Sequence, residues 1–357
     1  MAVVRQAGAC QDRPVKTDDA LVAGGAADET EGMIRIPGGA FLMGSEEFYP
    51  EELPLRTVRV RDFWIDARPV TVAEFRRFVE ATGYVTVAER PLDPTEYRDA
   101  DPTALVPGSA VFCPTEGPVP LDSMAWWRYV PGACWHAPEG PGSAVRGREQ
   151  HPVTHVAYED AEAYARWVGK ALPTESEWER AARGGLEGAR FGWGDEENPD
   201  GRWMANTWQG RFPWENLALD GYDGTSPVGS FPANGFGLYD MIGNVWEWTC
   251  DPGGGTAAST EPMSSPRCCA PADRSATSPD TTRIIKGGSH LCAPNYCLRY
   301  RPSARQAHAI DTSTSHIGMR CVIRDPAAFA GVGARRGRGQ AGRQSSRSAV
   351  DVNDIPG

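Results

Sequence analysis

Residues 286–301 read Lys-Gly-Gly-Ser-His-Leu-Cys-Ala-Pro-Asn-Tyr-Cys-Leu-Arg-Tyr-Arg, and the interpretation of the whole chain depends on this stretch. Cys292 and Cys297 are five positions apart, so on a straight strand their side chains would point to opposite faces. Pro294-Asn295 between them is a turn signal. We therefore expect a turn that brings the two sulfur atoms together.

A close pair of thiolates suits a soft d¹⁰ cation, either Cu(I) or Zn(II). Zinc commonly takes four ligands from two Cys-x-x-Cys or Cys/His pairs, and no second pair is evident in the sequence. Two thiolates alone suit Cu(I) better, because that ion accepts low coordination. From the spacing alone, a structural disulfide across the turn and two unrelated buried thiols remain as alternatives.

The bulk composition predicts a loop-rich α+β domain. Of 357 residues, 40% are hydrophobic and 23% are charged, as in globular proteins with a packed core. The chain also has 40 Gly, 30 Pro and 12 Trp, which favours aromatic packing over long helices and strands. The net charge of −11 argues against a nucleic-acid partner, since phosphate binding needs a basic face, and is compatible with a basic peptide substrate.

The chain divides into three parts. Residues 1–32 lack periodicity and predict a disordered leader, or upstream sequence if Met33 is the true start. Residues 33–325 predict one folded domain, and the Arg-rich residues 326–357 a disordered basic tail. We find no apolar run of about 20 residues and no signal peptide, so we expect no membrane association. The odd number of cysteines, 9, predicts reduced thiols and a cytoplasmic location.

Local patterns predict a few regular elements. Helices are expected over residues 71–83, 159–169 and 174–184, because each apolar stripe is followed by Gly. The first and third also open with Thr-x-x-Glu capping boxes. Residues 58–64 and 154–158 alternate in polarity and predict strands, whereas residues 198–280 predict mostly turns.

The segment around the cysteines resembles the active-site segment of formylglycine-generating enzymes, also called sulfatase-modifying factors. Ser289-x-x-Cys292-x4-Cys297 is the part that marks the oxidases within a wider superfamily. The resemblance implies a variant C-type-lectin-like fold with little regular secondary structure. Other stretches that resemble the family follow in order along the chain: Ile36-Pro-Gly-Gly-Ala-Phe-Leu-Met-Gly44, His151-Pro-Val-Thr-His-Val156, Leu172-Pro-Thr-Glu-Ser-Glu-Trp178, Ala205-Asn-Thr-Trp-Gln-Gly210, Asn234-Gly-Phe-Gly-Leu-Tyr239, Gly243-Asn-Val-Trp-Glu-Trp-Thr249 and Gly318-Met-Arg-Cys321.

The resemblance implies an activity and its site. Cys292 and Cys297 would bind Cu(I), with Ser289 beside the reacting centre and Trp246 and Tyr296 lining the pocket. The substrate is an unfolded sulfatase with a Cys-x-Pro-x-Arg motif, whose thiolate would be a third copper ligand. O₂ and a thiol reductant would then convert its cysteine to formylglycine through a thioaldehyde. For each aromatic residue taken alone, ordinary core packing is the alternative.

The resemblance also implies two calcium sites, because similar enzymes carry them and Ca²⁺ takes six to eight oxygen ligands. The first site would use the Asn206 and Asp220 side chains with the Thr207 and Tyr222 carbonyls. The second would use the Asp240 and Glu247 side chains with the Gly243 and Val245 carbonyls. The family has a similar Trp-Trp segment, so Trp126, Trp127 and Trp135 are candidates for a peptide-binding groove, with core packing as the alternative.

Departures from the family pattern concern the other cysteines. Secreted relatives cross-link the positions that match Ala165 with Cys321 and Ala182 with Pro302, and neither pair can form in this chain. This supports a reducing cytoplasmic setting and makes Cys321 a buried thiol. Cys268-Cys269 are expected to be loop thiols, and His151 and His155 structural histidines.

Two other functions compete with the oxidase, which we expect to act as a monomer. Superfamily relatives that form C–S bonds use non-haem iron held by an additional N-terminal helical domain, and only a short polar leader precedes Ile36. A non-catalytic lectin-like binding module is the second alternative. Such a module has no reason to keep two cysteines around a Pro-Asn turn.

Overall fold

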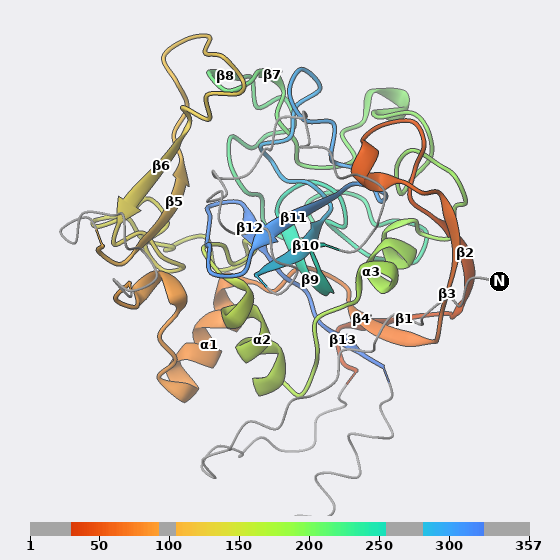
Figure 1. The fold of residues 1–357 in the computed structure, drawn as a ribbon, viewed down its shortest axis with the longest axis horizontal. Coiled ribbons are helices and arrows are strands. Elements are labelled where there is room, and N and C mark those ends of the chain that lie inside the picture. The colour runs from red at the N-terminus through yellow and green to blue at the C-terminus, as the bar shows by residue number, and fades with distance from the viewer. Residues whose placement is uncertain (1–29, 93–104, 255–280, 325–357) are drawn as a thin grey trace, which may run out of the picture. The chain divides into compact units, whose positions relative to one another are not determined.

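A computed structural model of the protein describes residues 30–92, 105–254 and 281–324, which belong to one compact unit that ends at Arg324 (Figure 1). Most of the predicted leader, the predicted basic tail and Cys268-Cys269 lie outside the described residues. No described helix is long and apolar enough to cross a membrane.

Short elements alternate with long irregular connections along the described chain. In chain order they are β1 (Met33–Ile36), β2 (Gly39–Met43), η1 (Pro50–Glu52), β3 (Arg56–Val60), β4 (Phe63–Asp66), α1 (Val72–Thr82), η2 (Val87–Glu89), β5 (Gly108–Phe112), β6 (Trp127–Pro131), α2 (Tyr158–Trp167), α3 (Glu175–Ala182), η4 (Pro199–Gly201), β7 (Gly210–Arg211), β8 (Glu215–Asn216), β9 (Trp246–Pro252), β10 (Thr282–Lys286), β11 (Arg305–Ala309), β12 (Ile317–Gly318) and β13 (Val322–Ile323). The α+β class with little regular structure is confirmed.

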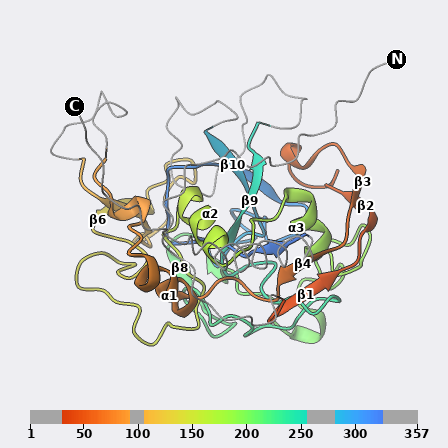
Figure 2. The same ribbon diagram turned by 90° about the horizontal axis from the view of Figure 1, so that it is seen from below.

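Two sheets organise this unit. The larger has the strand order β11–β10–β9–β12. Strand β10 is antiparallel to both of its neighbours, β9 and β11, whereas β12 is parallel to β9. It lies between α1 and α2 on one side and α3 on the other (Figures 1 and 2). The smaller sheet, β1–β4–β13, joins the two ends of the described chain. Three two-stranded ribbons complete the strands: β2–β3, β5–β6 and β7–β8.

The three predicted helices are confirmed. Thr71 caps α1 by accepting a hydrogen bond from the Glu74 amide, and Gly83 ends it in a left-handed conformation. An equivalent capping box from Thr174 starts α3. At α2, the Asp160 carboxylate accepts a hydrogen bond from the Ala157 amide, so the helix begins one residue before the predicted position.

The two predicted strands are wrong in different ways. Residues 58–64 form the end of β3 and the start of β4, which belong to separate sheets, because the chain turns at Asp62 around the close approach of Gly38. Residues 154–158 form no strand. His155 has a positive φ of 59° and bonds to the Ser109 hydroxyl, and α2 already begins at Tyr158.

The turn-rich prediction for residues 198–280 also needs a correction. Its described part includes β9, the longest strand of the described chain, which lies inside the larger sheet. The sequence of residues 243–249 did not predict a strand, because β9 is buried on both faces and therefore shows no alternation of polar and apolar residues.

Candidate active site

The predicted turn between Cys292 and Cys297 is confirmed. The Cys297 amide donates to the Ala293 carbonyl at 2.7 Å, and the Tyr296 amide donates to the same oxygen at 3.0 Å. The two Sγ atoms lie 3.3 Å apart, too far for a disulfide bond of about 2.05 Å. Both side chains are about 99% buried, with 1% exposed. The turn therefore presents two sulfur donors side by side in a dry environment.

Backbone geometry around Ser289 supports this pair. The Ser289 amide donates to Sγ of Cys292 at 3.4 Å, a contact that favours a negatively charged sulfur. Its hydroxyl oxygen accepts from the Leu291 amide at 3.2 Å, and the residue is fully buried. Gly288 before it has a φ of +70°, and an added Cβ would lie 2.8 Å from the Arg299 carbonyl oxygen. Only glycine lets the chain enter the turn so closely.

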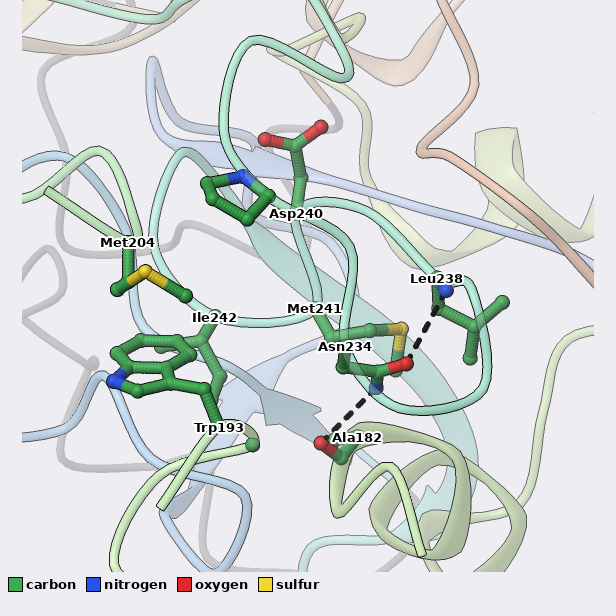
Figure 3. Close-up of a pocket in the computed structure, with 10 residues that line it drawn as sticks. Ala182, Trp193, Met204, Asn234, Leu238, Asp240, Met241 and Ile242 are labelled. Carbon is green, nitrogen blue, oxygen red and sulfur yellow. Dashed lines mark hydrogen bonds between the residues drawn. The ribbon is translucent and has the colours of Figure 1, made fainter. Parts of the chain in front are cut away.

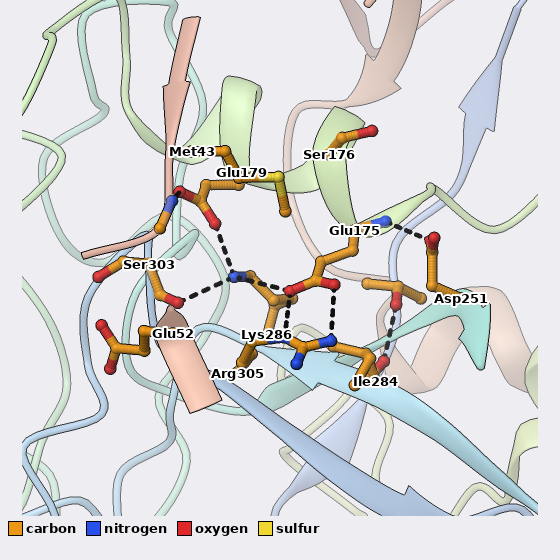
Figure 4. A network of polar contacts seen from close by, with 12 residues as sticks. Met43, Glu52, Glu175, Ser176, Glu179, Asp251, Ile284, Lys286, Ser303 and Arg305 are labelled. Atoms are coloured by element: carbon orange, nitrogen blue, oxygen red, sulfur yellow. Dashed lines mark hydrogen bonds and ion pairs between the residues drawn. The ribbon is translucent and has the colours of Figure 1, made fainter. Parts of the chain in front are cut away.

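The cysteine-containing loop connects β10 to β11, and buried ion pairs hold its two ends (Figure 4). The Lys286 ammonium lies 2.9 Å from Oε2 of Glu179 and 3.6 Å from Oε1 of Glu175. Arg305 donates to both oxygens of Glu175, at 2.7 and 3.0 Å. Burial alone would raise the pKa of Glu175, but the charges of Arg305 and Lys286 together lower it. Helix α3 thereby fixes the separation of the two strands that carry the loop.

Two further arginines attach the loop to η1. Arg299 pairs with Glu51, and Arg301 donates to Glu52, with 2.9 Å between Nη1 and Oε2. The Arg301–Glu52 side chains have no exposed surface, and Nε of Arg301 also donates to the Leu298 carbonyl next to Cys297. The sequence alone did not predict these pairs, because their members are about 250 positions apart.

We predict that Arg301→Met lowers the free energy of unfolding by about 3–5 kcal/mol, since it leaves the Glu52 carboxylate buried without its cation. The control is Arg35→Met, which breaks a solvent-exposed pair with Asp62 and should cost less than about 1 kcal/mol. Chemical denaturation of both variants measures the difference. Equal losses would mean that the Arg301 pair does not anchor the loop.

An aromatic cluster packs beside the thiol turn. The Tyr296 ring stacks on Phe212 with centroids 4.6 Å apart, and Trp126 meets both rings edge to face. Trp208 packs on Phe212, and its backbone amide donates to the Cys292 carbonyl. Trp208 was not among the predicted site residues, although it lies inside the stretch of residues 205–210 that resembles the family. The cluster keeps water away from one side of the sulfur pair.

The other predicted aromatic residues take different places. Trp127 lies on β6 and contacts His316, next to the cluster through Phe112. Trp135 instead packs on Phe75 of α1, within the core on that side. Trp246 is fully buried on β9 and belongs to the same hydrophobic core cluster as Cys292, Cys297 and Tyr296. Trp126 is thus the predicted groove residue that the structure brings to Tyr296.

Two tyrosines near the sulfur pair were not predicted. The Tyr49 hydroxyl accepts from the Leu298 amide, and the Tyr300 hydroxyl donates to Glu197 at 2.8 Å. Burial, with a smaller effect from negative charge at Cys297, raises the pKa of Tyr49 to about 12. Burial and the Glu197 charge also raise the pKa of Tyr300. Both phenols therefore keep their protons at neutral pH.

The first predicted calcium site has oxygens that fit a cation. Oδ1 of Asn206 and Oδ2 of Asp220 are buried and find no hydrogen-bond donor among the described residues. Burial raises the pKa of Asp220, as expected for a carboxylate that lacks a counter-charge. The Thr207 carbonyl already accepts a hydrogen bond from Gln209, which would have to move or share that oxygen with Ca²⁺.

The second predicted calcium site fits less well. Arg320 donates to both oxygens of Glu247, and the Trp178 indole donates to Oε2 at 2.6 Å. These contacts use three of the roughly four lone-pair positions of the carboxylate. Burial raises the pKa of Asp240 to about 6, and the nearby Glu247 charge adds to the shift. The Glu247 charge is therefore already balanced by Arg320 without a metal ion.

A small pocket lies near Asp240 but away from the thiols (Figure 3). The side chains of Trp193, Met204 and Ile242 line it, and the Asn234 amide closes one side by bonding to Ala182 and Leu238. Neither cysteine of the pair contributes to it. We therefore assign it no part in the site chemistry.

The remaining histidine and cysteine predictions agree with the geometry. His151 bonds to the Thr225 hydroxyl and His155 to the Ser109 hydroxyl, so both have structural partners. Cys321 is fully buried, and burial together with the Asp66 charge raises the pKa of its thiol. The predicted buried thiol is confirmed.

Comparisons with known proteins agree with this arrangement. The profile of the sulfatase-modifying factor enzyme 1-like domain matches residues 19–325. A formylglycine-generating enzyme of Mycobacterium tuberculosis is 57% identical over 296 residues, which cover 82% of this chain and 98% of that protein. The inactive C-alpha-formylglycine-generating enzyme 2 of Bos taurus is 36% identical over 82% of this chain and 88% of its own length.

A solved structure supports the fold as well. PvdO from Pseudomonas aeruginosa has a TM-score of 0.53 and 25% sequence identity, covering 85% of this chain and 99% of its own. The match of the family profile extends over all of the described residues, and the match to each of the two relatives covers most of that relative's length. The chain therefore belongs to the sulfatase-modifying factor enzyme 1-like family.

Proposed function

We propose that this chain oxidises the cysteine of a Cys-x-Pro-x-Arg motif in unfolded sulfatases to formylglycine and thereby activates them. Family membership alone is not sufficient support, because some relatives are named as inactive. The observation that carries the proposal is the buried pair of Cys292 and Cys297 sulfur atoms, 3.3 Å apart at the turn.

Cu(I) is the cofactor that best suits this pair. Cys292 and Cys297 would hold the ion, since two soft sulfur donors excluded from water match a soft cation. When bound, copper supplies the activation of O₂ that an organic side chain cannot provide. The Ser289 amide stabilises negative charge on Cys292, and the Tyr296 cluster limits access of water to the sulfur atoms.

The overall conversion balances with one external reductant. The substrate CH₂–SH group and O₂, with two protons and two electrons, give an aldehyde, hydrogen sulfide and water. The C–S bond and one Cβ–H bond of the substrate break, and a thiol reductant supplies the two electrons that the substrate does not. Cys292 and Cys297 are not consumed, because both remain ligands.

Substrate recognition rests on extended contact and charge. Trp127 is partly exposed and is retained as the candidate for the groove, whereas Trp126 and Trp135 are buried and are weaker candidates. Trp126 packs edge to face on Tyr296 and thus supports the site from the core. The net charge of −11 attracts a substrate that carries an Arg. Pro in the motif reduces the ordering cost of the extended peptide.

A short peptide tests the proposal. A Cys-x-Pro-x-Arg peptide given O₂, copper-loaded enzyme and a thiol reductant should gain an aldehyde that an aminooxy probe traps. Changing the peptide Arg to Ala should raise KM more than it lowers kcat, because that contact lies away from the reacting carbon. An unmodified cysteine peptide with folded, copper-loaded enzyme would contradict the proposal.

Calcium would act as a structural ion. Calcium chelation should lower the melting temperature before it changes copper binding, since the proposed ion joins loops and stabilises only the folded state. Asp220→Ala should lower the melting temperature in calcium and reduce the response to chelator. Glu187→Ala, at an exposed acid, is the control. A melting curve that calcium leaves unchanged would remove both proposed sites.

The state of the cysteines supports a proposal for the cellular compartment. Cys321 is a buried thiol whose family-equivalent partner position holds Ala165, so that structural disulfide cannot form. An enzyme that keeps two ligand thiols reduced suits a reducing compartment, and we propose a monomeric cytoplasmic enzyme.

A further inference from the structure

A second group of metal-ligand side chains lies outside the thiol turn. It consists of Glu89 at the end of η2 and of Cys134 and His136, which follow β6. One donor atom from each residue lies within 4.8 Å of the other two, and Nε2 of His136 is 3.2 Å from Oε1 of Glu89. The residues of the oxidase site are not part of this group. A metal ion bound by this group would therefore be independent of the proposed function.

The Glu89 carboxylate is held in place by one oxygen. Oε2 accepts from the Thr86 hydroxyl at 2.6 Å and from the Thr86 amide at 3.2 Å. This capping box leaves Oε1 directed to His136. An anchored carboxylate with one available oxygen matches the outer-shell support found around metal ligands.

A tight turn positions the other two ligands. Cys134 and Ala137 exchange backbone hydrogen bonds of 3.1 and 3.2 Å, which closes the turn. The intervening Trp135 is buried against Phe75, so the turn is fixed to the core. Cys134 and His136 are thus presented from the same rigid turn.

The three residues differ in their exposure. Cys134 is 3% exposed, whereas the side chains of His136 and Glu89 are 51% and 27% exposed. The exposed His136 side leaves room for an ion to enter and for a water ligand.

The donor set selects a class of metal. One sulfur, one imidazole nitrogen and one carboxylate oxygen suit a borderline divalent ion, and three protein ligands with water form a common zinc arrangement. Bond lengths of about 2.0–2.3 Å place tetrahedral donors roughly 3.3–3.6 Å apart, so the group needs to contract by about 1 Å. Exposed His136 can supply that movement by rotating its side chain. We propose that Glu89, Cys134 and His136 bind one Zn²⁺ with a water molecule as fourth ligand.

The experiment is a Zn²⁺ titration of the full chain against a chromophoric chelator in calcium-containing buffer. It starts from a Cys292→Ser, Cys297→Ser background, so that the oxidase pair contributes no thiolate. This background should bind one Zn²⁺ per chain. Cys134→Ser, His136→Ala and Glu89→Gln should each weaken that site by at least about 100-fold, more than the ~10–100-fold effect of losing an outer-shell partner.

Matched controls separate this site from other thiols. Cys113→Ser removes a partly buried cysteine outside the proposed zinc site. Cys268→Ser with Cys269→Ser removes two cysteines that are neighbours in the sequence. Neither change should alter Zn²⁺ affinity. In the Glu89→Gln variant the side-chain oxygen can still accept the Thr86 hydrogen bonds, so without zinc this variant should melt at the same temperature as the background.

A Co²⁺ titration gives a second readout. The background protein should show a thiolate-to-metal charge-transfer band that Cys134→Ser lacks, whereas His136→Ala should change the band without removing it. Two results would overturn the proposal. One is a background protein that binds no Zn²⁺, and the other is Zn²⁺ affinity and a Co²⁺ band that persist in folded Cys134→Ser.

Discussion

Each single variant Cys292→Ser and Cys297→Ser is expected to lose turnover by at least about 1,000-fold while remaining folded. The reason is that both sulfur atoms belong to one metal-binding unit. When residues act as a unit, the remaining residue cannot compensate for the loss of its partner, so one substitution removes most of the activity. Serine matches cysteine closely in shape but is a poor ligand for Cu(I). Steady-state oxidation of the peptide, together with thermal melting, measures the two effects separately.

The controls for this prediction are cysteines outside the turn. Cys113→Ser changes a partly buried thiol outside the turn, and Cys268→Ser changes a predicted loop thiol. Both should retain turnover within a few-fold of wild type. Comparable losses at all these positions would mean that the thiols serve structure, and that the catalytic pair is misidentified.

Copper affinity should depend on the same two residues. We expect one Cu(I) per chain to bind tightly, since the turn already holds both sulfur atoms 3.3 Å apart and little ordering cost remains. The Cys292→Ser, Cys297→Ser double variant should lose this binding by several orders of magnitude. An anaerobic titration against a Cu(I) chelator measures the difference. The proposed zinc group offers a weaker match for Cu(I), because only Cys134 supplies sulfur.

The copper titration can either support or contradict the assignment of Cys292 and Cys297 as ligands. Tight one-to-one binding in wild type and none in the double variant would support the ligand assignment. Tight binding that survives in the folded double variant would contradict it and would direct attention to Cys134 or to the remaining cysteines.

Local signals in the sequence predicted the parts of the fold that depend on nearby residues. The capping boxes at Thr71 and Thr174 gave helix starts because both partners are three positions apart. The Pro294-Asn295 turn was predictable for the same reason, and it determines the meeting of Cys292 with Cys297. Short-range chemistry therefore accounts for the central part of the site.

Features that depend on distant contacts could not be predicted. The alternation at residues 154–158 indicated a strand, but the bonds of His155 to Ser109 and Thr314 hold a left-handed residue there instead. The supports of the thiol loop, such as Arg301 with Glu52, join residues about 250 positions apart. No local pattern identifies such partners.

The candidate zinc ligands show a similar limit. Cys134-Trp-His136 is a short Cys/His spacing that was present in the sequence. Its third member, Glu89, lies 47 positions before His136 and is brought close only by η2 and the tight turn. A sequence search restricted to paired Cys/His motifs therefore misses this group.

The most direct test of the account is mass spectrometry of a denatured, reduced sulfatase that carries the Cys-x-Pro-x-Arg motif. The polypeptide is incubated with purified copper-loaded protein, O₂ and a thiol reductant, and the peptide containing the motif is analysed. The account predicts formylglycine at the motif cysteine with wild-type protein and unmodified cysteine with the Cys292→Ser, Cys297→Ser variant. An unmodified cysteine with the folded, copper-loaded wild-type protein would contradict it, as would equal formylglycine formation by the double variant.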